Sequence, residues 1–447
     1  MFLGSLGNLW LITRELFILR LRVVHLALHN LDEFYCMTPS MDWKLEATYT
    51  VPRWMVVPDI SNIEAISRNH LFANTDSSSA EELTVTFLAE GSFNKTYTVD
   101  TKTKSLVKSY VFRVSLPVEP GDKVRNEVAT LDYVKRHTKI PVPTVIAYDS
   151  SSDNVLGFEW ILMEKIPGVP LSDIWSRLSY ISKAAITREI ASHVFQLRHI
   201  CVFNEIGGLY HDSKAEFVIG PVVTQFMFMN GRRQLLLRDR GPYHHDSDFV
   251  RALIDVQIAD IYLLKTMPSN DPNFNQDVLE DGPAILRVMD ELLSLVPTIF
   301  PRDKKKGSFF SALLHPDLSL SNIMIDPNTL EITGIIDWEC TNASPLWQHA
   351  YPHFLTGPKV EKAPPRVEPG DTDEVRNEHW DNWEKMQLRA VFDEVVEPLA
   401  EEPLSRLRSE FMHSLDMAEL WQVMAERWIE KTRKELEALA IVRSNSV

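Results

Sequence analysis

The sequence predicts an α+β protein of two lobes, a small antiparallel sheet with one helix followed by a larger and mainly helical part. Residues 83–163 contain short strand-like runs around one helical pattern, and the loop Lys165-Ile-Pro-Gly168 then interrupts the chain. From Asp173 onward, apolar residues recur mainly at helical spacing. A chain of 447 residues is long enough to bury one large bilobal core. These observations together favour a bilobal fold.

Composition and charge limit the classes of function. The chain is 45% hydrophobic and 24% charged, as in an ordinary globular protein. Its net charge of −16 argues against a nucleic-acid partner, because neutralising phosphates requires basic patches. The 3 cysteines are far apart and include no C-x-x-C pair, which argues against a disulfide framework and against structural zinc.

Residues 1–45 are expected to be a leader that lies outside the folded lobes. The first part of this leader holds few charged residues: Arg14, Glu15, Arg20 and Arg22. No apolar run reaches the ~20 residues of a membrane span, so no transmembrane segment is expected. An arginine-bearing, acid-poor leader is typical of a mitochondrial presequence, whereas a true start near Met37 or Met41 is the alternative. Both a mitochondrial and a cytoplasmic location therefore stay open.

The small lobe is expected to span residues 46–165, after a polar linker at 74–82. Strands are predicted at 83–87, 95–99, 110–114, 144–148 and 158–163. Between the third and fourth strands, apolar residues at helical spacing predict a helix that begins near Asp122, with Asp122 as its N-cap. This order gives an antiparallel sheet with one helix.

The large lobe is expected to span residues 166–447. Three apolar stripes at helical spacing predict core helices around 186–197, 253–264 and 286–293. Residues 357–380, which are rich in proline and charge, predict a long exposed loop. The remainder, about 383–439, predicts amphipathic helix that packs on this lobe.

The chemistry-bearing motif is the predicted catalytic loop at 315–326, followed by 335–339. It places Asp317 and Asn322 five residues apart and then Asp337 at the end of an apolar strand-like run. Phosphoryl transfer to a hydroxyl needs one carboxylate to accept the proton, and an amide oxygen with a second carboxylate to hold Mg²⁺. The spacing D-x-x-x-x-N is that of a kinase catalytic loop. These residues therefore predict a phosphoryl-transfer site.

The tripeptide His315-Pro316-Asp317 also occurs in J domains. A J domain places this tripeptide between two helices of a short helical module, whereas an apolar strand pair follows it here. The J-domain interpretation is therefore disfavoured.

The chain from about 83 to 355 resembles the aminoglycoside phosphotransferase and choline kinase-like family, which has a protein-kinase-like fold. Within this family it is similar to fungal phosphotransferase-domain proteins of the altered-inheritance-of-mitochondria type. Besides the catalytic loop, the segments that carry this narrower resemblance are Arg113–Pro117, Glu127–Leu131, Ile140–Pro143, Gly157–Glu164 and Arg240–Tyr243.

The resemblance implies a role for each residue of the motif. Asp317 would be the catalytic base, and His315 would orient the loop through a hydrogen bond. Asn322 and Asp337 would hold Mg²⁺, to which hard oxygen ligands are suited. The reaction would move the γ-phosphate of ATP to a hydroxyl of a small molecule that the sequence does not identify, and protein partners stay unknown.

The resemblance also implies a nucleotide site in the small lobe. The turn at Gly91, Ser92 and Asn94 takes the place of the phosphate-covering loop, and Arg113 takes the place of the usual lysine on the third strand. We expect Arg113 to pair with Glu127 of the helix. The hinge would be formed by Met163, Glu164 and Ile166.

Two alternatives to an active small-molecule kinase stay open. Arg113 and the single-glycine turn at Gly91 favour a catalytically weak pseudokinase or scaffold, with a mitochondrial location as one option. A protein kinase proper is disfavoured, because the chain has no Asp-Phe-Gly or Ala-Pro-Glu segment.

Overall fold

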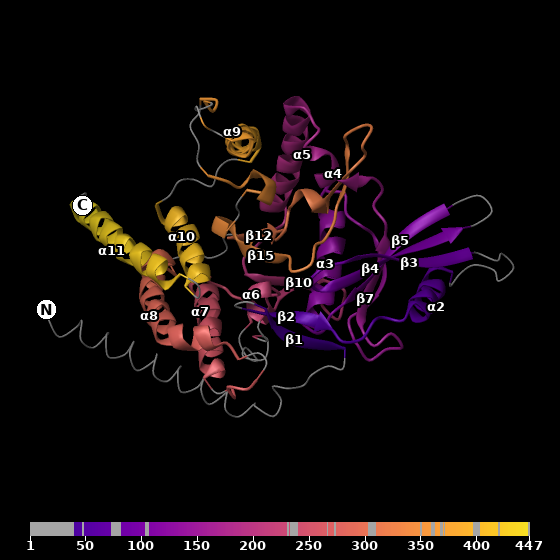
Figure 1. The fold of residues 1–447 in the computed structure, drawn as a ribbon, viewed down its shortest axis with the longest axis horizontal. Helices are drawn as coiled ribbons and strands as arrows, with labels where there is room; N and C mark the ends of the chain where they lie inside the picture. The colour runs from indigo at the N-terminus through magenta and orange to yellow at the C-terminus, as the bar shows by residue number, and fades with distance from the viewer. Residues whose placement is uncertain are drawn as a thin grey trace.

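The computed structural model describes residues 40–46, 49–72, 82–102, 107–229, 232, 240–265, 267–271, 274–302, 310–348, 351–358, 363–366, 370, 372–396, 403–418 and 421–445. The expected leader at 1–45 lies outside the described residues except for its last six positions, and the expected linker at 74–82 lies outside them except for Glu82. The described chain forms two lobes, with the small lobe at the right of Figure 1.

The small lobe is built on a five-stranded antiparallel sheet in the order β3-β4-β5-β7-β6. Its strands are β3 (Glu82–Glu90), β4 (Asn94–Lys102), β5 (Val107–Ser115), β6 (Val145–Asp149) and β7 (Glu159–Glu164). All five strands were predicted from the sequence. The register places Arg113 of β5 between Thr96 of β4 and Ile161 of β7, so it lies in the middle of the sheet.

The predicted helix is α3 (Asp122–His137), but its N-cap differs from the prediction. The capping residue is Gly121, at φ +75°, while the Asp122 carboxylate accepts a hydrogen bond from Arg125 at 2.5 Å. Gly121 in turn donates its N–H to Glu159 of β7 at 2.8 Å. The helix therefore has no side-chain cap, and the N–H of its N-cap residue is bonded instead to a carboxylate of a distant strand, which no local pattern could have indicated.

The expectation of a single helix in this lobe was wrong. A second helix, α2 (Ile60–Leu71), begins after Asp59, whose side chain caps it by accepting the N–H of Ser61 at 2.8 Å. Its buried residues Ile63 and Ile66 belong to the core cluster of the sheet. Before it, β1 (Met41–Glu46) and β2 (Tyr49–Trp54) pair as a hairpin, so a strand crosses the boundary expected at 45 and 46. The sequence contained two signals for this helix, namely Asp59 as an N-cap and the helical spacing of Ile63 and Ile66.

The connection between the lobes pairs with the strand at the end of the predicted catalytic loop. After β7 the chain turns at Gly168 and forms β8 (Val169–Pro170), which pairs with Met324 and Ile325 of β13 (Ile323–Ile325). Gly168 has φ +104°, and a Cβ there would lie 2.3 Å from the carbonyl oxygen of Ile325. Only glycine fits this close approach.

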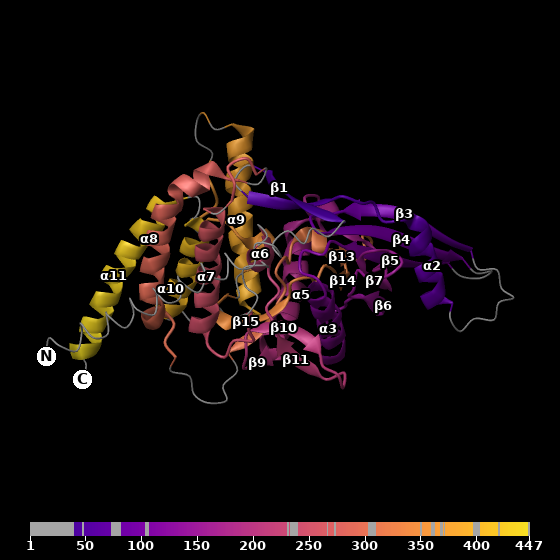
Figure 2. The same ribbon diagram turned by 90° about the horizontal axis from the view of Figure 1, so that it is seen from below.

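The large lobe contains most of the helices. They are α4 (Ser172–Trp175), α5 (Tyr180–His199), α6 (Gln225–Phe228), α7 (Asp246–Leu264), α8 (Gln276–Ile299), α9 (Asp373–Asp393), α10 (Pro403–Met417) and α11 (Gln422–Asn445). The three predicted core helices correspond to α5, α7 and α8. Helices α7, α8, α10 and α11 lie side by side at the end of the molecule away from the small lobe (Figure 2), and they share one apolar core.

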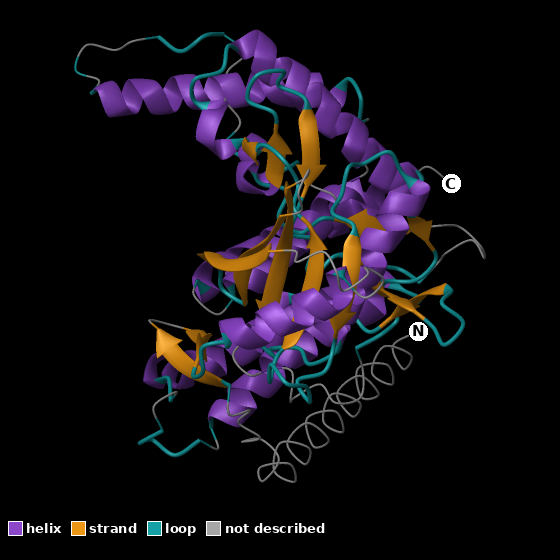
Figure 3. Cartoon of the chain, turned by 90° about the vertical axis from the view of Figure 1, so that its right-hand side faces the viewer, coloured by secondary structure: helices purple, strands orange, loops and turns teal. Residues whose placement is uncertain are grey.

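The large lobe is mainly helical, as predicted, and it also holds two sheets (Figure 3). Their strands are β9 (Val202–Phe203), β10 (Gly207–His211), β11 (Phe217–Gly220), β12 (Ser311–Leu314), β14 (Ile332–Ile335) and β15 (Asn342–Pro345), with β8 and β13. The order is β11-β10-β15-β12-β9 in one sheet and β14-β13-β8 in the other. Short 3-10 turns follow, at Leu320–Asn322, Leu346–Gln348 and His353–Leu355. The sheets place the predicted catalytic loop between β12 and β13.

The exposed loop predicted at 357–380 is shorter than expected, because α9 begins at Asp373. Thr372 caps this helix by accepting the N–H of Val375 at 3.3 Å. Residues 359–362, 367–369 and 371 of the predicted loop lie outside the described residues. No helix in the described ranges is long and apolar enough to cross a membrane.

Candidate active site

Asp317 and Asn322 are joined as their spacing predicts. The loop leaves β12 and makes a single 3-10 turn, so both side chains come to lie on one side of it. The Asn322 amide nitrogen donates to the Asp317 side-chain oxygen Oδ2 and to its backbone carbonyl, each at 2.9 Å. Because the amide nitrogen is committed to Asp317, the amide oxygen is the Asn322 atom left for a cation.

His315 fixes the beginning of this loop. Its Nδ1 accepts the N–H of Asp317 at 3.2 Å, and its Nε2 lies 3.0 Å from the carbonyl oxygen of Ile336. Burial lowers the pKa of His315 to about 4, so the ring is neutral near pH 7, with its proton on Nε2. The N–H of Ile336 donates to the carbonyl of Asn322 at 2.9 Å. Ile336 therefore ties both parts of the loop to the residue before Asp337.

Asp337 has an unusual backbone conformation for a residue that is not glycine, with φ +64°. Its side chain is 38% exposed, and its Oδ1 lies 3.6 Å from Nη1 of Arg113. Burial, and then the carboxylate of Glu339, raise the pKa of Asp337 to about 7, while Arg113 opposes them. A divalent cation at this position would favour the charged form.

Arg113 pairs with Glu127, as predicted. One guanidinium nitrogen of Arg113 is hydrogen-bonded to the Glu127 carboxylate, and both side chains are buried. Burial acts to lower the pKa of Arg113, but Glu127 and Glu339 outweigh it and raise that pKa. The guanidinium therefore stays charged and connects β5, α3 and the segment that bears Asp337.

A second buried ion pair lies beside the first, and sequence analysis missed it. Lys123 of α3 lies 2.6 Å from Glu339, with side chains that are 1% and 13% exposed. Burial acts to raise the pKa of Glu339, but Lys123 and Arg113 lower it, so Glu339 is charged. Lys123 precedes Glu127 by one helical turn and Glu339 closely follows Asp337, but only the packing of the two lobes brings Lys123 and Glu339 together.

The predicted phosphate-covering turn divides into exposed and buried halves. Gly91 and Ser92 are exposed, and the Gly91 N–H donates to the carbonyl of Asn94 at 2.9 Å. Phe93 is buried against Phe228 of the large lobe, with ring centroids 5.4 Å apart. The turn is therefore anchored to the large lobe by an aromatic contact.

The Asn94 amide is directed inward, and its role as a nucleotide contact stays a prediction. The amide nitrogen donates to Glu339 at 2.7 Å. The amide oxygen accepts from Ser115 at 2.8 Å and from Lys123 at 3.0 Å. The Asn94 side chain is thus engaged with protein groups on both sides of the amide.

The predicted hinge residues lie at the end of β7 and just beyond it. Met163 is buried and Glu164 is exposed. Ile166 packs on the sheet of β14, β13 and β8, since a Cβ at Gly334 of β14 would lie 2.8 Å from the Ile166 side chain. The three residues therefore line the connection between the lobes, where their backbone groups rather than their side chains would contact a base.

The oxygen ligands needed for Mg²⁺ are present. The Asn322 amide oxygen and the Asp337 carboxylate lie on adjacent strand ends, because the Asn322 carbonyl accepts the N–H of Ile336. In the described part of the chain, no cluster of three or more His, Cys, Asp and Glu side chains is arranged to hold a metal ion. Mg²⁺ is usually held by one or two carboxylates with water and phosphate, so a site with few protein ligands fits that ion.

A further neighbour of Asp317 was also missed. His353, in the last of the 3-10 turns, has its Nδ1 2.9 Å from Oδ1 of Asp317. The two side chains are 60% and 51% exposed. Because 36 residues separate them, no local spacing could have indicated this contact.

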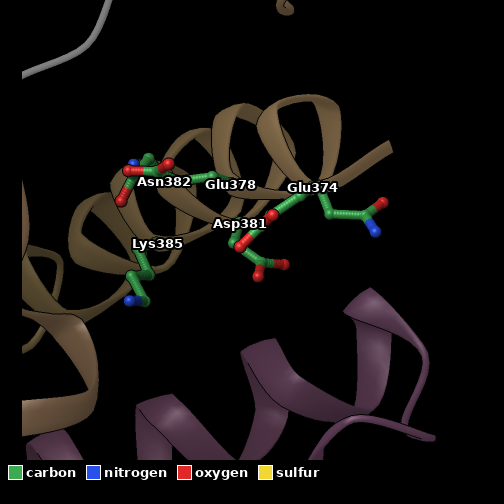
Figure 4. Close-up of a pocket in the computed structure, with 6 residues that line it drawn as sticks. Glu374, Glu378, Asp381, Asn382 and Lys385 are labelled. Atoms are coloured by element: carbon green, nitrogen blue, oxygen red, sulfur yellow. The ribbon is translucent and has the colours of Figure 1, made fainter. Parts of the chain in front are cut away.

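A surface hollow on α9 lies apart from these groups (Figure 4). It is lined by Glu374, Asn377, Glu378, Asp381, Asn382 and Lys385, all of them on one helix. None of the predicted site residues lines it, so it forms no part of the candidate active site.

The fold and the site together define a bilobal, kinase-like phosphotransferase fold. A sequence profile of the phosphotransferase enzyme family, APH, matches residues 84–196 and 248–393, which is more than half of the chain. The protein belongs to this family, as its resemblance to the aminoglycoside phosphotransferases and choline kinases predicted.

Named relatives agree with the fungal subgroup. The chain is 29% identical over 310 residues to a subtelomeric hrmA-associated cluster protein of Aspergillus fumigatus, covering 60% of this chain and 59% of that protein. It is 24% identical over 352 residues to the altered inheritance of mitochondria protein 9, mitochondrial, of Candida glabrata, covering 64% and 53%. The chain thus spans little more than half the length of these relatives.

Solved structures include similar chains of low identity. A Plasmodium vivax ethanolamine kinase is 14% identical, with a TM-score of 0.42, over 81% of each chain.

Proposed function

We propose that this protein transfers the γ-phosphate of ATP to a hydroxyl group of a small molecule, with Mg²⁺ as the metal ion. The observation that carries the proposal is the hydrogen-bonded pair of Asp317 and Asn322, with Asp337 at the adjoining strand end. Membership of the phosphotransferase enzyme family supports it. The nucleotide would supply the phosphoryl group, and the metal ion would neutralise its charge.

Asp317 acts in this proposal as the base that accepts the hydroxyl proton. Its Oδ2 is held by Asn322, while its Oδ1 lies 2.9 Å from the exposed ring of His353. An acceptor hydroxyl would therefore approach Oδ1 and take the place of His353. General-base assistance of this kind contributes about 10²- to 10⁴-fold to a rate.

The other residues hold the reacting groups in position. Asn322 and Asp337 would bind the metal ion through oxygen atoms, and Arg113 would place a fixed positive charge beside Asp337. Gly91 and Ser92, the exposed half of the turn, would cover the phosphates, with the Ser92 backbone N–H as the donor because the Gly91 N–H is bonded to Asn94. Met163, Glu164 and Ile166 would border the adenine.

The experiment that tests this proposal compares wild-type protein with Asp317→Asn. Each is incubated with ATP, Mg²⁺ and a cell metabolite extract, and mass spectrometry then identifies any compound that gains a phosphate. We expect such a compound with the wild type and with Asp153→Asn, an exposed aspartate that serves as control. Phosphorylation that is equally fast with Asp317→Asn would contradict the role of Asp317.

The second candidate function is a catalytically weak pseudokinase that acts as a scaffold. The observation that favours it is the arginine itself, since the planar guanidinium of Arg113 stands where a lysine usually pairs with the helix glutamate. A scaffold would bind nucleotide without Mg²⁺ dependence and would yield no phosphorylated compound. Binding measured by calorimetry with Mg²⁺ and with EDTA distinguishes the two functions.

We also propose a mitochondrial location. It rests on relatives that are named as mitochondrial proteins and on the arginine-bearing segment at the amino terminus. Imaging of the full chain with a carboxyl-terminal fluorescent tag tests it, and a purely cytoplasmic signal would contradict it.

A further inference from the structure

The pair formed by Lys123 and Glu339 belongs to a buried polar network that the proposed chemistry does not use. Lys123 lies in the first turn of α3, in the small lobe, and Glu339 lies two residues beyond Asp337, in the large lobe. Their charged atoms are 2.6 Å apart, and the Lys123 side chain is 1% exposed. An ion pair this deeply buried links the two lobes beside the candidate active site.

Asn94 and Ser115 complete the network. Asn94 bridges the two charges, since it donates to Glu339 at 2.7 Å and accepts from Lys123 at 3.0 Å. Ser115, at the end of β5, donates to the same Asn94 oxygen at 2.8 Å. One network thus joins the base of the phosphate-covering turn, the strand of Arg113, helix α3 and the segment after Asp337.

The backbone on both sides of Glu339 has a strained conformation that must be held by its surroundings. Asp337 has φ +64° and Cys340 has φ +59°, a conformation that non-glycine residues rarely adopt. Such a conformation is strained and persists only where the surrounding structure holds it. Glu339 lies between the two strained residues, so its bonds to Lys123 and Asn94 are placed to hold this segment.

We propose that Lys123 and Glu339 are positioning residues, whose ion pair holds residues 337–340 so that the Asp337 carboxylate is presented to the metal ion of the bound nucleotide. This inference rests on the function proposed above. In this proposal Glu339 does not itself bind the metal ion, since its carboxylate is already bound by Lys123 and Asn94. Removing the pair would therefore weaken metal-dependent nucleotide binding without removing any metal ligand.

A purely structural ion pair predicts a different result. Loss of one partner leaves the other charge buried alone, which destabilises the fold, and loss of both partners relieves that penalty. If the pair only stabilised the contact between the lobes, a double variant that regains stability would also regain nucleotide binding. If it positions Asp337, stability returns but binding does not.

The test uses Lys123→Met, Glu339→Gln and the double variant Lys123→Met/Glu339→Gln in the full chain. Urea unfolding measures stability, and calorimetry with a non-hydrolysable ATP analogue measures affinity with Mg²⁺ and with EDTA. We expect the double variant to be more stable than Lys123→Met, while its Mg²⁺-dependent affinity stays at least about tenfold weaker than in the wild type. If Lys123→Met does not fold, Glu339→Gln, which keeps an oxygen acceptor for Lys123 and Asn94, replaces it in the comparison.

A matched control comes from another Lys–Glu pair at the same distance. Lys183 of α5 lies 2.6 Å from Glu384 of α9, and neither residue is among the predicted site residues. We expect Lys183→Met/Glu384→Gln to leave the Mg²⁺-dependent affinity unchanged.

The outcomes separate this inference from the proposed function. A folded Lys123→Met/Glu339→Gln variant that binds the analogue with wild-type affinity in Mg²⁺ overturns the positioning role and leaves the proposed function intact. A wild-type protein without any Mg²⁺-dependent binding overturns the proposed function, and the positioning role with it.

Discussion

The guanidinium of Arg113 is hydrogen-bonded to the carboxylate of Glu127, and its other terminal nitrogen lies 3.6 Å from Asp337. One buried side chain therefore connects the sheet and helix of the small lobe to the predicted metal ligand of the large lobe. Lysine has a single terminal nitrogen and could not contact both carboxylates with separate nitrogen atoms. Arginine at this position can therefore contact a carboxylate in each lobe.

Removal of this charge is expected to destabilise the protein. Arg113→Met leaves Glu127 buried without its partner, and we expect a loss of about 3–5 kcal/mol in the free energy of unfolding. The double variant Arg113→Met/Glu127→Gln should recover much of that loss, because no isolated charge is then buried. Urea unfolding followed by circular dichroism measures both. An Arg113→Met variant as stable as the wild type would show that the pair contributes little.

Gly168 is expected to tolerate no side chain. Gly168→Ala places a Cβ 2.3 Å from the carbonyl oxygen of Ile325 at φ +104°, so we expect a loss of at least about 2 kcal/mol in unfolding free energy. Gly91→Ala is the control, because a Cβ there meets nothing within 4 Å, and we expect a change of at most about 0.5 kcal/mol. Thermal and urea unfolding compare the two variants. Equal stability of both would refute the close approach.

Asn322 is expected to affect nucleotide binding through the metal ion. Asn322→Ala removes one oxygen ligand, so we expect affinity for an ATP analogue to fall about tenfold or more in Mg²⁺ and to change little in EDTA. Asn328→Ala, in the exposed turn that follows, should bind as the wild type does. Calorimetry under both conditions gives the four affinities. An equal loss in EDTA would place the effect on the loop instead of the metal ion.

His193 is expected to contribute a loss of stability in mild acid. This buried residue of α5 has no hydrogen-bond partner on either ring nitrogen in the described part of the chain, and burial lowers its pKa to about 4. Between pH 6.5, its ordinary value, and about pH 4, the unfolded chain binds a proton that the folded protein does not. Stability is therefore fully present above pH 6.5 and is lost as the pH falls, by up to about 1.4 kcal/mol per pH unit from this group.

The variant His193→Leu isolates this contribution. We expect the wild type to lose more unfolding free energy, or to gain less, than His193→Leu as the pH falls from 6.5 to 4. His315 contributes to both proteins in the same direction as His193, and Glu159 and Asp337, whose pKa values burial raises, contribute to both in the opposite direction. His199→Leu, which removes an exposed imidazole from the same helix, controls for the substitution itself. Urea unfolding at several pH values measures the slopes. Identical slopes for the wild type and His193→Leu would exclude the proposed effect.

Much of the small lobe was predictable because its signals are local. Strand-like runs such as 95–99 and the apolar spacing around Val124 and Val128 correspond to β4 and α3. The N-cap of α3 was mistaken by one residue, since Gly121 is the N-cap and Asp122 is the first residue of the helix. Helix α2 was overlooked although Asp59 signalled its start.

The sequence by itself determined the pairs whose partners are close along the chain or aligned by regular structure. Asp317 and Asn322 are separated by one 3-10 turn, and Asn322 meets Ile336, next to Asp337, because β13 and β14 form a hairpin. Arg113 and Glu127 follow from a strand packed on the next helix.

Only the tertiary structure decided the contacts that cross the lobes. The bonds of Asn94 to Glu339, of Lys123 to Glu339 and of His353 to Asp317 join residues of separate elements. No periodicity encodes such contacts, because they depend on how the two lobes pack. The sequence therefore determined the predicted residues of the candidate site. The packing of the lobes decided how the segment that bears Asp337 is held. The physical reason is burial, because a buried charge is stable only beside its partner.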